Sequence, residues 1–240
     1  MKNQSPIITS IDDVVMFVNE KVESSYTYPK DYKVKNISEQ IKILHQLFPN
    51  IGSANEKLAK QPLPLGAEGW FAIPRWEKIA PTYNEAVQKV LDLINRDRNG
   101  MFFNYENQLG PQYLRQSQKS IKAFRELGNK QKGYDILVVP AQFGLLHRGQ
   151  SVRRARSIMN TNEFGLGAFA IGIMLLTHPE REVQNKQLHV DCAGDEFSPF
   201  ADGNFSKVPI FYFFYDILKF CTILYELTYK DSGSASAFLP

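Results

Sequence analysis

A run of almost wholly apolar residues, Phe164 to Thr177, constrains the fold of this chain more than any other feature. A membrane-spanning helix needs about 20 apolar residues, so this shorter run predicts a helix buried in a protein core. Gly165, Gly167 and Gly172 weaken such a helix unless a neighbouring element packs closely against it. We therefore expect the rest of the chain to surround this helix.

A second apolar stretch, Pro209 to Tyr229, is long enough to cross a membrane, but it contains Asp216, Lys219 and Glu226. Charges inside a membrane span are costly, and the aromatic and β-branched residues of the stretch favour strands. The sequence predicts a hairpin formed by residues 208–215 and 217–229, and no membrane insertion.

Helices and strands follow one another without the steady alternation of a parallel α/β protein. The predicted helices start at Ser10, run over Ser38–Phe48, start at the Thr82–Glu85 capping box, run from near Pro111 to before Gly128, and cover Ser151–Met159. The predicted strands are Ile136–Val139 and Leu188–Cys192, besides the hairpin. We expect an α+β fold in which helices pack around a small mixed or antiparallel sheet, with a C-terminal hairpin.

Gln61 to Gly69 contains two prolines and two glycines and is typical of a linker. It divides the chain into a helical N-terminal appendage, 1–61, and a main α+β domain, 62–240. Residues 66–81 contain both tryptophans, and Pro74 makes a regular helix there unfavourable. We expect an extended or looping aromatic segment.

The composition, 43% hydrophobic and 22% charged residues in a chain of 240, excludes global disorder. Cys192 and Cys221 are too few for a disulfide framework or a four-thiolate zinc site. The N-terminus lacks the apolar region of a secretory signal, so we expect a reduced, cytoplasmic setting.

Charge is distributed unevenly along the chain. Residues 107–162 contain ten lysines and arginines against Glu126 and Asp135, whereas the remainder has an acidic excess. A basic middle in a slightly acidic chain is the pattern of a protein that faces an anion. The alternative is that the lysines only keep exposed helices soluble.

The segment Ile136–Arg156 predicts a strand, a loop and a helix with Ser151 as its N-cap. Free amides at a helix start favour an anion, and guanidinium groups match phosphate oxygens. The predicted phosphate- or nucleic-acid-binding residues are Arg148, Ser151, Arg153, Arg154 and Arg156, extended by Arg115, Lys119 and Lys122. The segment Gly144–Ser151 resembles a phosphate loop but has Gln150 where that motif needs lysine. The alternative is an exposed helix whose arginines pair with carboxylates of the chain.

A second group of polar residues follows the strand Leu188–Cys192. Strand alternation places His189 and Asp191 on one face, and Asp195 and Glu196 follow in a glycine turn. Together with His147 they could supply acid and base groups for a small hydrolase or transferase, with or without a metal. The motif is incomplete, so we expect no metal and no cofactor, and a half-exposed strand with an acidic turn is the alternative.

Trp70, Phe71 and Trp76 could stack on bases or sugars, although such residues more often belong to a core. The leading hypothesis is a protein that binds nucleic acid or another phosphate-bearing ligand through the arginine segment. The acid–base hypothesis is the rival, and an interaction protein without a small-molecule site is the third. Whether the chain is an enzyme stays open.

Four stretches of the chain, GAEGWFAIPRW, HRGQSVRRAR, NEFGLGAFAIGIMLLTHPER and DCAGDE, together resemble a family of uncharacterised bacterial proteins. The resemblance covers roughly residue 62 to the end. It implies no activity, and it makes the first sixty residues a variable addition.

Overall fold

The structure is a computed structural model, and it describes residues 17–182 and 184–240. Its α-helices are α2 (Ile37–Leu47), α3 (Tyr83–Asp97), α4 (Gln118–Lys130), α5 (Val152–Ile158) and α6 (Ala168–Thr177). Its strands are β1 (Gly69–Pro74), β2 (Phe102–Asn104), β3 (Leu114–Gln116), β4 (Ile136–Gln142), β5 (Glu163–Gly165), β6 (His189–Asp191), β7 (Asp195–Phe197), β8 (Lys207–Phe214), β9 (Ile217–Leu224), β10 (Ser232–Ser234) and β11 (Ser236–Phe238). The short 3₁₀ helices are η1 (Glu56–Lys60), η2 (Trp76–Lys78), η3 (Leu145–His147) and η4 (Pro179–Arg181).

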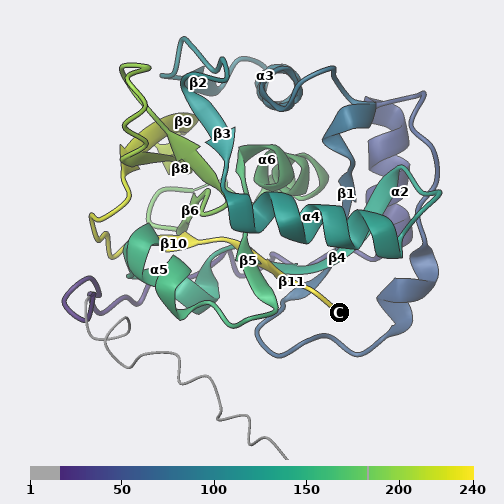
Figure 1. Cartoon of the computed structure of the whole chain (residues 1–240), viewed down its shortest axis with the longest axis horizontal. Coiled ribbons are helices and arrows are strands. Elements are labelled where there is room, and N and C mark those ends of the chain that lie inside the picture. Colours follow the sequence, from purple (N-terminus) through teal and green to yellow (C-terminus); the bar gives the residue numbers. More distant parts are fainter. Residues whose placement is uncertain (1–16, 183) are drawn as a thin grey trace, which may run out of the picture.

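The strands form two sheets. One has the order β1-β4-β11-β5, and the other the order β10-β6-β8-β7-β3, with β9 joining β8 to β2. In Figure 1, α6 lies behind α4 and beside α3, within the body of the molecule. The predicted α+β class is confirmed, with two sheets where the sequence indicated one.

The predicted buried helix is α6, and each of its ten residues is buried. A Cβ atom on Gly172 would stand 2.3 Å from a methyl of Val90 on α3, so glycine allows these two helices to approach. The helix begins at Ala168 rather than at the start of the apolar run, because Glu163–Gly165 pair with β11 as strand β5. The first residues of the apolar run thus form a strand instead of the first turn of the helix.

Local sequence signals, two of which are helix caps, place three helices correctly. Thr82 and Glu85 make both hydrogen bonds of the predicted capping box at the start of α3. Ser151 is the N-cap of α5, and the predicted second helix is α2, capped by Asn36. The helix expected from Pro111 was predicted too early, since residues 114–116 pair with β7 and Ser117 caps α4.

The predicted C-terminal hairpin is β8 and β9, joined at Tyr215 and Asp216, which both have positive φ angles. Its second strand ends at Leu224, earlier than expected. Phe211 and Phe220 are fully buried on its inner side. The strand from Ile136 also continues past Val139 to Gln142.

The helix predicted from Ser10 lies mostly outside the described residues, and residues 17–22 form a turn and a β-bridge. Ile37, Ile41 and Leu44 of α2 pack into the same core as β1. The division of the chain near residue 61 stays a prediction. Within residues 17–182 and 184–240, no helix has the length and apolar character needed to cross a bilayer.

Candidate ligand-binding pocket

The arginines of the predicted anion site bind other parts of the chain. Arg153 pairs with Glu20, to which its Nε donates at 3.1 Å, and its Nη1 lies 3.4 Å from the carboxylate of Glu226. Arg156 donates from Nε to the Ala193 carbonyl at 2.9 Å and from Nη2 to the Asp195 carbonyl at 2.6 Å. These two guanidinium groups therefore fasten α5 to neighbouring segments.

The remaining members of that set are also engaged. Arg148 donates to the Tyr26 carbonyl at 3.1 Å, and Arg154 donates to the Phe17 carbonyl at 2.9 Å. Ser151 accepts from the Arg154 amide at 3.0 Å, as an N-cap does. An anion site here would need free guanidinium groups beside free backbone amides. In the described residues, these guanidinium groups all donate to other parts of the chain.

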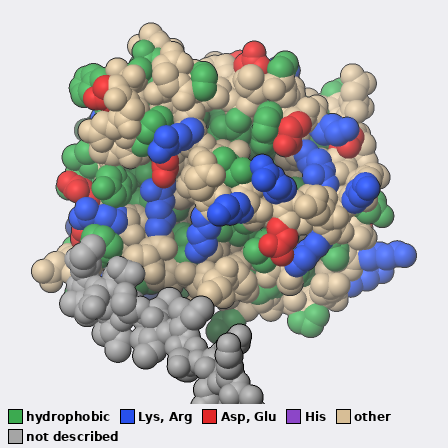
Figure 2. Space-filling model, in the orientation of Figure 1, with side chains coloured by type: hydrophobic (Ala, Val, Ile, Leu, Met, Phe, Trp, Pro, Cys, Tyr) green, Lys and Arg blue, Asp and Glu red, His purple; other side chains and the backbone are tan. Residues whose placement is uncertain are grey.

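The predicted basic extension is split between two elements. Arg115 lies on β3, not on a helix, and its Nε donates to Glu196 at 2.7 Å. Lys119 and Lys122 both belong to α4. Figure 2 shows Lys and Arg side chains scattered over the face of the molecule that carries α4.

The two histidines of the acid–base hypothesis have separate carboxylate partners. His147 Nε2 lies 2.7 Å from Glu163, and both side chains are almost fully buried. His189 Nδ1 lies 3.7 Å from Glu182. Each ring therefore has its own carboxylate neighbour from outside the predicted set.

The three carboxylates of that hypothesis also contact different partners. Asp191 accepts a hydrogen bond from Ser232 at 3.2 Å, Asp195 contacts Tyr83, and Glu196 pairs with Arg115. Among the described residues, no group of three or more His, Cys, Asp or Glu side chains could hold a metal ion. Among the described residues, no hydrogen bond or ion pair joins two members of the predicted set, although His189 lowers the pKa of Asp191 electrostatically.

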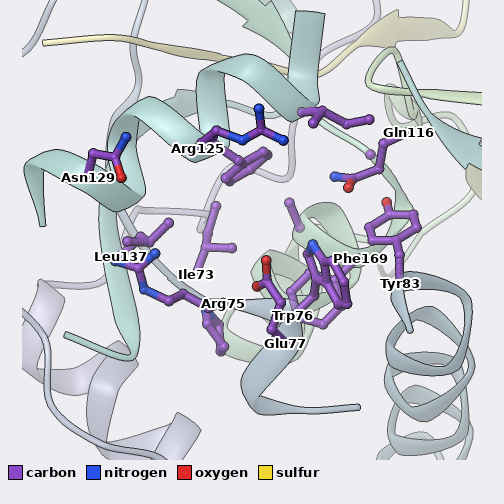
Figure 3. Close-up of a pocket in the computed structure, with 15 residues that line it drawn as sticks. Ile73, Arg75, Trp76, Glu77, Tyr83, Gln116, Arg125, Asn129, Leu137 and Phe169 are labelled. Carbon is purple, nitrogen blue, oxygen red and sulfur yellow. The ribbon is translucent and has the colours of Figure 1, made fainter. Parts of the chain in front are cut away.

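A pocket of about 310 Å³ lies instead between the end of β1, α4 and the start of α6. Figure 3 shows Arg125 and Asn129 of α4 along one side, with Trp76 and Phe169 across the hollow from Arg125. The apolar part of its wall is formed by Ile73, Pro74, Trp76, Ile121, Phe124, Leu137, Phe169 and Ala170. Trp70 and Phe71, the other aromatics considered for stacking, are core residues.

Four polar side chains of the pocket wall are free to contact a ligand. In the part of the chain that the structure describes, Glu77, Gln116, Arg125 and Asn129 make no side-chain hydrogen bond or ion pair with the protein. Figure 3 shows the amide of Gln116 directed into the hollow from the side that also carries Tyr83. The pocket thus offers a cation, a carboxylate and two amides beside an aromatic wall.

Arg75 also lines the pocket, but its donors are used. Its Nε donates to the Tyr134 carbonyl at 2.7 Å, and its Nη2 donates to the carbonyls of Gly128 and Gln131 at 2.7 and 3.0 Å. It thereby ties the C-terminal end of α4 to the end of β1. A cation at the end of a helix is also favoured by the helix dipole.

A buried pair, Tyr83 and Asp195, supports the wall of the pocket next to Gln116. The Tyr83 hydroxyl lies 2.8 and 2.9 Å from the two carboxylate oxygens of Asp195, and the Ala168 amide donates to the same carboxylate at 2.7 Å. Burial raises the pKa of Asp195 to about 7, although its hydrogen bonds act in the opposite direction. A Cβ atom on Gly167 would stand 2.2 Å from this carboxylate, so glycine is needed there.

The sequence reasoning missed most of this pocket. Trp76 was considered for stacking, and Arg125 was counted among the basic residues, but Glu77, Gln116 and Tyr83 carried no signal of their own. Tyr83 follows Thr82 and looked only like the first residue of a capped helix. Gly167, just before the apolar helix, was the one sequence feature that indicated a close approach of another residue to the backbone there.

Comparison of the chain with protein-family models, with curated proteins and with solved structures finds no match, so the resemblance to a bacterial family stays a prediction.

Proposed function

We propose that this pocket binds a small ligand that combines a flat ring with an anionic group, the chemistry of a mononucleotide. The supporting observation is that the indole of Trp76 and the unpartnered guanidinium of Arg125 face one hollow of about 310 Å³. Aromatic side chains stack on bases of every kind, and guanidinium groups match phosphate oxygens. The base would lie on Trp76 and the phosphate at Arg125.

The other polar groups suit the edge of a heterocyclic base. Glu77 can accept hydrogen bonds, while Gln116 and Asn129 can both donate and accept. The volume lies at the lower end of the range of about 300–1,000 Å³ that is usual for small-molecule pockets, which favours one small molecule. A phosphate-bearing partner is thereby proposed for a surface other than the arginine segment.

The charge around the pocket would help to attract such a ligand. Lys119 and Lys122 lie on the same helix as Arg125, and the Lys122 side chain makes no hydrogen bond or ion pair with another described residue. Like-signed charges around a binding site raise the rate of encounter with an opposite charge, and salt weakens the effect. Association should therefore slow as the salt concentration rises.

Calorimetric titration with uridine and cytidine monophosphate, and with the two nucleosides, tests the proposal. Arg125→Gln should weaken nucleotide binding about tenfold and leave nucleoside binding unchanged, because only the phosphate loses a charge-assisted hydrogen bond. Lys42→Gln on α2 removes an equal charge away from the pocket and should change neither. Absence of binding by all four compounds would overturn the proposal, as would an equal loss for nucleosides and nucleotides.

Trp76 gives a second measurement. Because the other tryptophan, Trp70, is buried in the core, ligand-dependent quenching of indole fluorescence should arise at Trp76. Trp76→Phe should abolish the quenching while retaining a ring for stacking. Quenching that persists in this variant would place the ligand elsewhere.

A further inference from the structure

Asp195 does not line the pocket, yet it contacts a residue that does. Its carboxylate is fully buried and lies within hydrogen-bond distance of the Tyr83 hydroxyl, at 2.8 and 2.9 Å. Tyr83 itself is buried and is one of the residues that line the pocket. Its hydroxyl therefore stands between a carboxylate and whatever occupies the pocket.

We infer that the protonation state of Asp195 decides whether Tyr83 offers the pocket a hydrogen-bond acceptor or a hydrogen-bond donor. This inference deepens the proposed function and rests on it for its ligand. Asp195 acts through Tyr83 and is a positioning residue.

The direction of the switch follows from counting protons. An ionised Asp195 can only accept, so it takes the proton of the Tyr83 hydroxyl. The lone pairs of the phenol oxygen then remain for the ligand. Tyr83 is then an acceptor.

Protonation of Asp195 reverses this arrangement. One carboxyl oxygen, Oδ2, still accepts from the Ala168 amide, and the other can donate its new proton to the Tyr83 oxygen. Asp195 then uses a lone pair of the phenol oxygen. The hydroxyl proton of Tyr83 is released toward the pocket, where Tyr83 becomes a donor.

The surroundings of Asp195 place this change near neutral pH. Burial is the largest influence and raises the pKa of Asp195 to about 7, with a smaller contribution in the same direction from Glu196. The Ala168 amide, Tyr83 and Arg156 lower it. Cys192 also lies close enough to interact with Asp195, and burial raises the pKa of its thiol well above the ordinary value, which keeps it neutral.

Uridine and cytidine monophosphate are suitable probes because they have nearly the same size but opposite hydrogen bonding at ring position N3. Uracil donates there and cytosine accepts. Both phosphates titrate alike, with a second pKa of about 6, so the ratio of the two affinities cancels that contribution. As the pH rises from about 5.5 to 8.5, the affinity for uridine monophosphate relative to that for cytidine monophosphate should increase about tenfold in the native protein.

Two variants define the controls. Asp195→Asn keeps the size of the side chain and presents an amide that donates to Tyr83 at every pH, so its ratio should stay at the acidic value. Tyr83→Phe should show a ratio that does not depend on pH. A native ratio that is also constant would overturn the inference while leaving the proposed binding intact.

Infrared spectroscopy of the ligand-free protein provides a readout that needs no nucleotide. The C–O stretch of a tyrosine depends on whether its hydroxyl donates or accepts, so acidic-minus-basic difference spectra should contain one tyrosine shift that both variants lack. If neither nucleotide binds but this shift is present, the proposed function fails and the Tyr83 switch stands. Absence of the shift would refute the switch.

Discussion

Two basic regions of the molecule, the arginine segment 148–156 and the helix α4, use their charges in different ways. In the arginine segment every guanidinium donates to a carbonyl or carboxylate of the chain. On α4, Arg125 borders a pocket, and its guanidinium makes no hydrogen bond or ion pair with another described residue. A cation that joins two segments and a cation that awaits a ligand look identical in a sequence, and only their partners distinguish them.

The largest expected effect is on stability, in the arginine segment. Arg156→Met should lower the free energy of unfolding by about 2–4 kcal/mol, because two buried carbonyls lose hydrogen bonds from a charged donor. Arg125→Met should change it by no more than about 0.5 kcal/mol, as is usual for exposed residues. Urea denaturation of the two variants compares the regions directly. Equal losses would mean that the difference between the regions is not real.

Asp195 contacts both Arg156 of the arginine segment and Tyr83 of the pocket, and it should make the stability depend on pH. Its pKa is raised to about 7 in the folded protein, as is that of Asp191, above the ordinary value of 3.8. The folded state therefore binds more protons between these values, and stability falls as the pH rises from about 4 to 7, by about 1.4 kcal/mol per pH unit for each group.

Asp195→Asn removes the contribution of one of these two groups. Thermal denaturation at several pH values should show a smaller fall of stability with pH in this variant than in the native protein. Asp191 contributes a remaining fall, and His178, whose pKa burial lowers to about 4, contributes a rise in the same window. If the two slopes coincide, Asp195 does not titrate in this window, and its protonation cannot change the hydrogen bonding of Tyr83.

The smallest expected effect concerns binding to a polyanion. Two double variants remove the same formal charge from different places. The first pair is Lys122→Gln with Arg125→Gln, and the second pair is Arg153→Gln with Arg154→Gln. Only the first pair removes cations that are free to release counterions, so it should lower the salt concentration of elution from a polyanion column more than the second pair does. A larger shift for the second pair would restore the arginine segment as the anion-binding surface.

The sequence predicted most of the elements that local signals specify. The capping box at Thr82, the Ser151 cap, the buried helix α6 and the hairpin of β8 and β9 all depend on residues close together in the chain. Errors occurred where distant pairing competes with local preference. Residues 114–116 form a strand because β7 is available to them, and Glu163–Gly165 are drawn into a sheet by β11.

The candidate pocket could not be predicted in the same way. Its walls come from β1, η2, α3, β3, α4, β4 and the start of α6, which are brought together only by packing around the buried helix. Of the polar residues that line it, only Arg125 belonged to a pattern, the basic middle of the chain. The partners of the arginine segment also lie outside its sequence neighbourhood: Glu20 is 133 residues from Arg153, and the two carbonyls that accept from Arg156 are 37 and 39 residues away.

The sequence alone thus determined that an apolar helix must be enclosed, where several helices begin and which strands turn back on each other, because burial periodicity and capping are properties of neighbouring residues. The tertiary structure decided which charges are free. A free charge is one that no distant carbonyl or carboxylate reaches, and reach is set by how the sheets and helices pack.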